Sequence, residues 1–139
     1  MIKNILIIED NPSDIKYYQA LFAPEREVSF LFLTRNKGYG KEKLKELIEL
    51  LYGEIFLKIK NYFVYTKETI REFLKDDPFD FYIIDSLEDF AKSLVTETDL
   101  LKEKIAFMSS RKSFRESIQS EGYRVYSKNN IDGLIKECF

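Results

Sequence analysis

Residues 79–86 read Phe-Asp-Phe-Tyr-Ile-Ile-Asp-Ser, and this stretch decides the fold of the chain. Apart from Asp80 it is a run of aromatic and branched apolar residues that ends at one carboxylate, Asp85. An apolar run without polar alternation is typical of a strand that is buried on both faces, as in a parallel sheet. Asp85 then stands at the strand end, on the edge of an open α/β sheet where ligands bind. A carboxylate in this place can also simply cap the following turn.

The composition limits the chemistry that the chain can perform. Its 139 residues suffice for one domain with a sizeable core, and a net charge of −2 gives no support for a nucleic-acid partner. The absence of histidine excludes Ser-His-Asp and Cys-His hydrolases and most catalytic zinc sites. The single cysteine, Cys138, has no internal partner, which agrees with a reducing compartment. Because no stretch approaches the ~18 apolar residues of a membrane helix, we expect a cytoplasmic protein without membrane contact.

Short apolar runs alternate with helical patterns along the whole chain. We expect strands at about 5–8, 28–33, 61–65, 79–85, 104–108 and 123–127. Helices are expected at about 12–23, 41–52, 67–76, 88–96, 112–120 and 131–139, with Asn11 and Thr66 as caps of the first and third. This order predicts a single α/β domain over residues 1–139, with a doubly wound parallel sheet and helices on both of its faces.

The segment around helix 41–52 leaves two questions open. If Gly53 ends the helix as a C-cap, residues 54–60 become an extra strand, whereas the spacing of Leu51, Ile55 and Ile59 favours continuation of the helix. We prefer continuation to about residue 60. The apolar stripe of this helix (Leu44, Leu47, Ile48 and Leu51) is interpreted as core, and a homodimer contact through the same helix is the alternative.

Polar residues stand at the ends of four predicted strands. They are Glu9 with Asp10, Asp85, Ser109 and Lys128. Because the carboxyl ends of parallel strands share one edge of the sheet, we expect these side chains to converge there. Clustered carboxylates repel one another unless a hard divalent cation lies among them, and such oxygen ligands suit Mg²⁺. The group is suited to receiving a phosphoryl group on one carboxylate, while the cation and the ammonium neutralise charge and the hydroxyl donates to it.

This arrangement resembles the receiver domain of two-component response regulators, a flavodoxin-like fold with a five-stranded parallel sheet. The resemblance rests on Ile-Leu-Ile-Ile-Glu-Asp at 5–10, Phe-Asp-Phe-Tyr-Ile-Ile-Asp at 79–85, Ile-Ala-Phe-Met-Ser-Ser at 105–110 and Tyr-Arg-Val-Tyr-Ser-Lys at 123–128. It covers residues 1–24 and 61–139. Residues 27–60 are then an insertion, which either adds a strand and a helix at one edge of the sheet or replaces the usual second strand.

The resemblance also implies a role for each polar residue. Asp85 would accept the phosphoryl group, Ser109 would contact it and Lys128 would pair with it. The resemblance implies a Mg²⁺ site formed by Glu9, Asp10, Asp85 and the backbone carbonyl of Leu87. The protein would be a stand-alone receiver without an output domain, and it would not be an enzyme. A histidine kinase or a phosphotransfer protein would phosphorylate it, and it would signal by binding a downstream protein.

The chain departs from the family pattern near the site. Asp89 stands where the family usually has Pro, and no Gly follows before the next predicted strand. Asn129 replaces the Pro that usually follows the Lys, so we expect no cis peptide bond there. Val125 occupies the position of the family's aromatic switch residue, and Tyr126 is expected to point to the opposite face of its strand.

Two alternative functions are considered, and these departures favour the first of them. The first is a degenerate receiver that is not phosphorylated and serves as a protein-interaction module. The second is a small Mg²⁺-dependent phosphohydrolase with Asp85 as its nucleophile. Such enzymes typically have a second Asp two residues further on, and Leu87 stands in that place.

Overall fold

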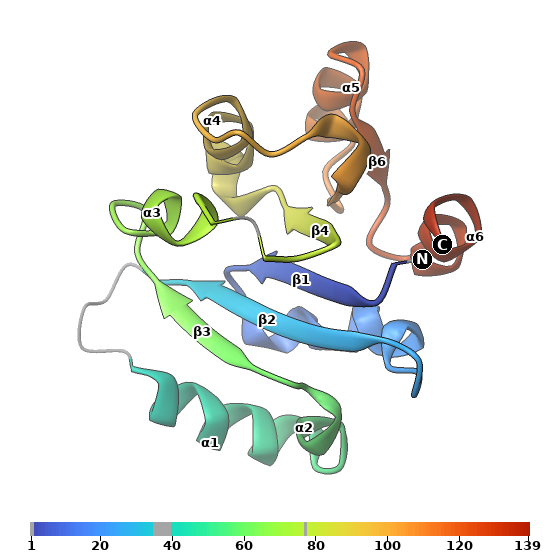
Figure 1. Cartoon of the computed structure of the whole chain (residues 1–139). Coiled ribbons are helices and arrows are strands. Elements are labelled where there is room, and N and C mark those ends of the chain that lie inside the picture. Colours follow the sequence, from blue (N-terminus) through green and yellow to red (C-terminus); the bar gives the residue numbers. More distant parts are fainter. Residues whose placement is uncertain (1, 35–39, 77) are drawn as a thin grey trace.

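A single parallel sheet of six strands forms the centre of the computed structural model, which describes residues 2–34, 40–76 and 78–139 (Figure 1). The strands are β1 (Asn4–Glu9), β2 (Glu27–Leu33), β3 (Tyr62–Tyr65), β4 (Phe81–Asp85), β5 (Ile105–Met108) and β6 (Arg124–Tyr126). Their order in the sheet is β3-β2-β1-β4-β5-β6, and every pairing is parallel. The predicted α/β class with a parallel sheet is confirmed, with six strands rather than five.

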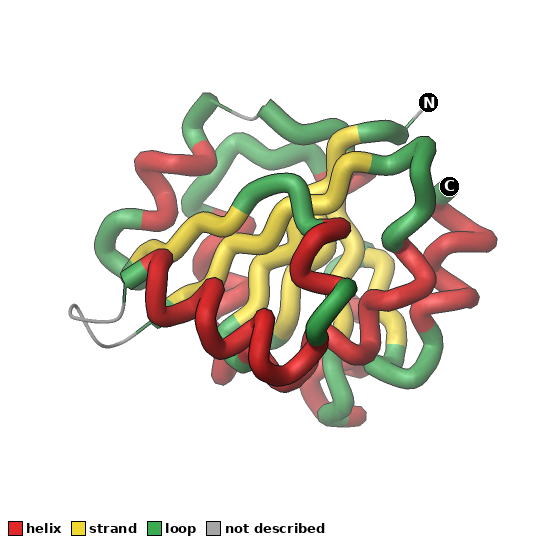
Figure 2. Tube along the Cα trace, turned by 90° about the horizontal axis from the view of Figure 1, so that it is seen from below, coloured by secondary structure: helices red, strands yellow, loops and turns green. Residues whose placement is uncertain are grey.

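Helices cover both faces of the sheet, which explains why its strands are apolar on both sides. The first face packs against η1 (Pro12–Leu21), α1 (Lys41–Tyr52) and α6 (Ile131–Cys138). The other packs against α3 (Ile70–Leu74), α4 (Phe90–Thr96) and α5 (Lys112–Ser120). Neighbours on β1 separate accordingly, with Ile7 in the first layer and Ile8 in the second. Figure 2 shows the strands lying between these helices, an arrangement consistent with a doubly wound fold.

The helix layers follow the direction in which the strands are added. From β1 the chain steps outward through β2 to β3 with η1 and α1 on one face. It then returns across the sheet and steps from β4 to β6 with α3, α4 and α5 on the other face. A reversal of direction together with a change of face gives all crossovers the same hand. The order of the strands reverses between β1 and β4, so the switch point of the sheet lies there.

The second strand of the resemblance is not the one that was matched from sequence. Strand β2 lies next to β1, and the strand predicted at 61–65 is instead the edge strand β3. Of the two alternatives for residues 27–60, this agrees with replacement of the usual second strand. The burial explains the placement: Val28–Leu33 are all buried, as an interior strand requires, whereas Phe63–Tyr65 are only half-buried.

The expectation of continued helix beyond residue 52 is wrong. Gly53 has φ 55° and ends α1 as a C-cap, which glycine does without steric cost. Residues 54–60 do not become a strand either, because Ile55–Lys58 form the short helix α2.

Two other predicted helices begin or end elsewhere. Asn11 caps η1 as expected, since its side chain accepts a hydrogen bond from Ser13 N at 3.1 Å, but this helix is of the 3₁₀ type and ends at Leu21. Helix α3 begins at Ile70 and not at residue 67. The Thr69 hydroxyl accepts from Thr66 N at 3.0 Å, so a side-chain turn occupies the residues before the helix.

Candidate functional site

Three carboxylates meet where β1 and β4 end. The pairing of Ile8 with Ile84 brings the last residues of these strands, Glu9 and Asp85, to the same edge at the switch point. One carboxylate oxygen each from Glu9, Asp10 and Asp85 lies within 4.8 Å of the others. Glu9 and Asp85 are buried, and Asp10 is exposed. The cluster therefore combines buried charge with an open side, which is the arrangement that a divalent cation can use.

Lys128 extends into this cluster from the segment after β6. Its Nζ lies 2.8 Å from Asp85 Oδ1 and 3.1 Å from Asp14 Oδ2, and it also donates to Glu9 Oε2. The lysine side chain is buried. One ammonium group thus faces three carboxylates, so the described side chains around it leave the site with excess negative charge.

Two residues of η1 complete the cluster, and sequence reasoning gave neither a place in it. Tyr18 donates its hydroxyl hydrogen to Glu9 Oε2 at 3.0 Å and accepts from Lys128 Nζ at 3.3 Å. Tyr18 and Asp14 both lie outside the predicted strand ends from which the site was assembled. Their spacing of four, which places two polar groups on one face of a predicted helix, was the available signal.

Burial and neighbouring charges set the protonation of the site. Burial, followed by the Asp85 carboxylate, raises the pKa of Glu9 to about 8, although Lys128 opposes this. Burial likewise raises the pKa of Asp10. For Lys128, burial acts against the charged form, but the Glu9 and Asp85 carboxylates outweigh it and the pKa rises. Lys128 is therefore charged at neutral pH, and the acids compete for protons that a cation would replace.

The hydrogen bonds to Glu9 nevertheless suit its ionised form. Oε1 accepts from the backbone N–H groups of Asp10 and Asn11 at 3.0 and 3.3 Å. Oε2 accepts from Lys128 and Tyr18. Because all four partners are donors, it is burial, followed by repulsion from the Asp85 carboxylate, that raises the pKa of Glu9 and favours a proton on it.

A left-handed turn follows Asp85. Leu87, Glu88 and Asp89 have φ of 51°, 53° and 75°, so the predicted helix 88–96 begins only at Phe90. Each non-glycine residue in this region costs about 1–2 kcal/mol. Leu87 is buried in the second core layer, which holds the turn in place. The N–H of Leu87 donates to Asp85 Oδ2 at 2.9 Å, so the contact that the structure records is made by this N–H and not by the carbonyl named from the resemblance.

The two serines after β5 have different surroundings. Ser109 is buried, and its Oγ accepts from Arg111 N at 3.1 Å. The guanidinium of Arg111 lies 2.6 Å from Asp89 Oδ1 and thereby joins the left-handed turn to the start of α5. An open cavity of about 320 Å³ is lined by Asp10, Asn11, Asp14, Asp85, Ser86, Glu88, Asp89, Ser110, Arg111 and Lys128. Ser110 lines this cavity, whereas Ser109 lies behind it.

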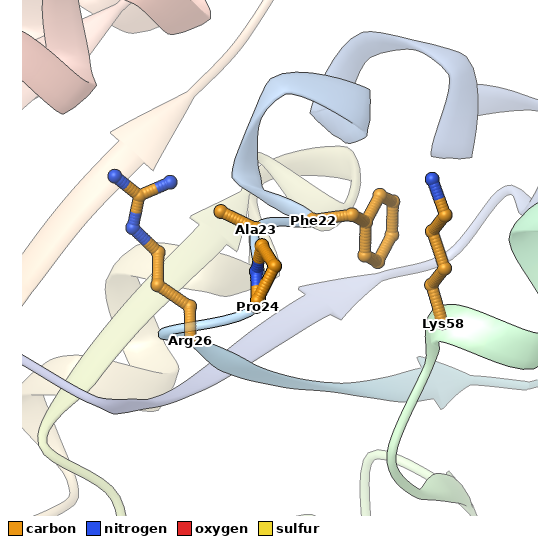
Figure 3. A pocket seen from close by; sticks show the side chains of 5 residues that line it. All are labelled: Phe22, Ala23, Pro24, Arg26 and Lys58. Atoms are coloured by element: carbon orange, nitrogen blue, oxygen red, sulfur yellow. The ribbon is translucent and has the colours of Figure 1, made fainter.

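A separate cavity of about 280 Å³ lies at the opposite edge of the sheet, beside the start of β2 (Figure 3). It is lined by Phe22, Ala23, Pro24, Arg26 and Lys58, and Figure 3 shows Arg26 and Lys58 on either side of Pro24. None of these lining residues is fully buried or carries a carboxylate. The carboxylate cluster therefore lines the other cavity, at the carboxyl edge of the sheet.

Comparison of the chain with protein-family models, with curated proteins and with solved structures finds no match. Among the described residues, no helix has both the length and the apolar character needed to cross a bilayer.

Replacement of Lys128 should test the charge balance of the cluster. We expect Lys128→Met to lower the free energy of unfolding by about 3–5 kcal/mol in EDTA, because buried carboxylates lose their ammonium partner. The raised folded-state pKa means that the lysine stabilises fully below its unfolded pKa and that this effect disappears only in strong alkali. Urea unfolding followed by circular dichroism measures the change. The exposed Lys136→Met is the control, with an expected change within about 0.5 kcal/mol; equal losses in both variants would contradict the assignment.

The pH dependence should reveal the proton on Glu9. The folded-state pKa of about 8 exceeds the ordinary value of 4.5, so the stabilising effect of this proton is lost as the pH rises through about 8. Without cations, the contribution of Glu9 to stability should fall as the pH rises from about 4.5 to about 8. Mg²⁺ should raise the thermal stability, and the increment should grow over the same range because cation binding expels the proton. Asp10→Asn should lose most of the Mg²⁺ increment. An increment that is independent of pH would refute this coupling.

The left-handed turn predicts an unusual response to glycine. Glu88 is exposed and has φ 53°, so Glu88→Gly should be more stable than Glu88→Ala by about 1 kcal/mol, because both variants lose the same side chain and only alanine keeps the cost of positive φ. Glu116 is also exposed but lies within α5, and Glu116→Gly should be less stable than Glu116→Ala by about 1 kcal/mol. Urea unfolding of the four variants provides the comparison, and a Glu88→Gly variant less stable than Glu88→Ala would argue against the turn.

Proposed function

We propose that the chain is a receiver domain of the response-regulator type, which accepts a phosphoryl group on Asp85. One observation carries the proposal: Lys128 Nζ lies 2.8 Å from Asp85 Oδ1 at the edge of a three-carboxylate cluster. The donor would be the phosphohistidine of a histidine kinase or of a phosphotransfer protein in the cytoplasm. The phosphorylated chain would act by binding a downstream protein, and the chain is not proposed to be an enzyme that turns over a substrate.

The transfer forms an acyl phosphate on Asp85. A carboxylate oxygen of Asp85 attacks the phosphorus, the P–N bond of the phosphohistidine breaks, and the departing imidazole nitrogen takes a proton from water. Lys128 and the N–H of Leu87 contact the two oxygens of Asp85 and hold the carboxylate in place. Glu9, Asp10 and Asp85 are the residues that would hold Mg²⁺, which would neutralise charge on the phosphoryl oxygens.

The cavity beside Asp85 supplies further donors for the phosphoryl group. Ser110 and Arg111 line it together with Lys128, so a hydroxyl and two cations face the space next to the reacting carboxylate. Ser109 was assigned the phosphoryl contact from the resemblance. Its hydroxyl oxygen accepts from Arg111 N, which leaves its own hydrogen as a donor.

The alternative is a degenerate receiver that binds a protein without being phosphorylated. The position of Tyr126 favours it, because this tyrosine packs in the first core layer while Val125 packs against the second. The Tyr126 hydroxyl contacts Glu137 of α6, so its described partner lies on the face away from α5. In response-regulator receivers, the serine or threonine at this strand end is usually coupled to the aromatic switch residue. The hydroxyl contacts of Tyr126 lead to α6 and not to Ser109.

Acetyl phosphate separates the two functions. Incubation with acetyl phosphate and Mg²⁺ should add the mass of one phosphoryl group to the intact protein, and omission of Mg²⁺ should abolish the addition. Asp85→Asn should take up no phosphoryl group. Asp76→Asn, which changes an exposed carboxylate outside the cluster, should behave as the unaltered chain.

Beryllofluoride provides an independent measurement, because with Mg²⁺ it mimics a phosphoryl group on Asp. Binding should raise the melting temperature of the unaltered chain and of Asp76→Asn, but not that of Asp85→Ala. Absence of both the mass gain and the beryllofluoride response would reject phosphorylation and leave the degenerate receiver.

A further inference from the structure

An ion pair separates two cavities at the carboxyl edge of the sheet. Arg111 Nη2 lies 2.6 Å from Asp89 Oδ1, and both residues line the cavity of about 320 Å³ that contains Asp85. The same two residues line a second cavity of about 200 Å³, together with residues of α4 and α5 that include Lys92 and Ser117. The Asp89–Arg111 pair is therefore a shared wall between the carboxylate cluster and the surface of α4 and α5.

Both partners of this ion pair are exposed to solvent and belong to different elements. The Arg111 side chain is 46% exposed and that of Asp89 is 72% exposed. Asp89 ends the left-handed turn after β4, whereas Arg111 directly precedes α5. An exposed ion pair contributes little to stability, because water solvates the separated charges almost as well. The guanidinium can therefore leave Asp89 at a small cost in free energy.

The guanidinium of Arg111 also lies within electrostatic range of Asp85. Its hydrogen bond to Asp89 raises the pKa of Arg111, and the charge of the Asp85 carboxylate acts in the same direction. Two carboxylates thus attract one guanidinium, and the hydrogen bond goes to Asp89. A phosphoryl group on Asp85 would change this balance, because it brings roughly two negative charges and three acceptor oxygens into a cavity that Arg111 already lines.

Lys128, the second cation among the described residues that line this cavity, cannot change partners in the same way. Its ammonium is buried and already contacts Glu9, Asp14 and Asp85. Movement away from these carboxylates would leave buried charges without a partner, which is costly. Of the two cations, Arg111 is the one that is free to move to a new acceptor.

We propose that Arg111 exchanges Asp89 for the phosphoryl group when Asp85 is phosphorylated, and that Asp89 is the competitor that holds the guanidinium until then. This inference rests on the function proposed above. Because the Asp89–Arg111 pair is the wall shared by two cavities, its separation changes the surface between α4 and α5. The exchange thus carries the state of Asp85 to that surface without an aromatic residue coupled to Ser109.

Binding of beryllofluoride with Mg²⁺, followed by the amide NMR signals of the chain, tests the competition. Arg111→Gln should weaken binding by about fivefold or more, because the bound anion loses a cationic donor. Asp89→Asn should strengthen binding about threefold, because it releases the guanidinium. Direct repulsion between Asp89 and the anion would strengthen binding too, so the double variant decides: once Arg111→Gln is present, Asp89→Asn should have no further effect.

Lys112→Gln is the matched control, because it removes one positive charge from the adjacent, exposed residue. This variant should bind as the unaltered chain does, and circular dichroism confirms that all variants are folded. A gain in the double variant over Arg111→Gln, or an equal loss in Lys112→Gln, would overturn the exchange. Absence of binding by the unaltered chain rejects the proposed function and this inference together, whereas binding with unchanged affinity in Arg111→Gln rejects this inference alone.

The same titration measures whether the exchange reaches the second cavity. The amide signal of Ser117, which lines that cavity, should shift when beryllofluoride binds to the unaltered chain. In Arg111→Gln at saturating beryllofluoride, this signal should keep its unbound position, because no guanidinium leaves Asp89. Equal shifts of Ser117 in the two proteins would refute the coupling between the cavities.

Discussion

The buried ammonium of Lys128 is the interaction on which the site depends. It connects the end of β6 to β1, β4 and η1 through Glu9, Asp85 and Asp14. Without it, the buried carboxylates of Glu9 and Asp85 would repel one another at the carboxyl edge of the sheet. With it the carboxylates stay close together, but their negative charges still outnumber the positive charge of the lysine. A further cation or a proton would therefore stabilise the cluster. This links the stability of the sheet to the chemistry proposed for its edge.

The topology of the sheet explains why Glu9 and Asp85 lie close enough to share Lys128. The strands that carry Glu9 and Asp85 are neighbours because the order of the sheet reverses between them, and helices on opposite faces leave their carboxyl ends open. The left-handed turn after Asp85 has a similar function on a smaller scale. It turns the N–H of Leu87 back onto the carboxylate while the side chain of Leu87 enters the core. Local backbone strain and core packing therefore meet at Leu87, next to the Asp85 carboxylate.

Much of this could be predicted from sequence because it depends on local patterns. The apolar runs at 5–8 and 81–84 have no polar alternation, which is typical of parallel strands covered on both faces, and the carboxylates that follow such strands share one edge of the sheet. The cap at Asn11 follows from side-chain chemistry at a single position, whereas the apolar spacing of Leu51, Ile55 and Ile59 wrongly favoured a helix that continued through Gly53. Helix α5 was predicted with its observed bounds because its apolar spacing is regular.

The remaining features depend on tertiary structure. Residues 27–33 and 61–65 have similar apolar patterns, so their sequences do not show which of them lies next to β1. The placement depends on which strand is buried more completely in the folded chain. The role of Tyr18 in the cluster could not be predicted, because its hydroxyl meets Glu9 only in the folded chain. The left-handed turn at Leu87 contains no glycine, so no residue signalled it. Burial of the leucine, its N–H bond to Asp85 and the ion pair of Asp89 with Arg111 hold it.

The position of β3 makes the segment from α1 to β3 part of the essential scaffold. Because β3 covers the outer side of β2, it shields a strand whose residues Val28–Leu33 are all buried. Truncation of that segment would convert an apolar interior strand into an open edge with unpaired backbone groups, the kind of surface on which chains aggregate. Strand β3 is therefore part of what keeps the apolar strand β2 covered.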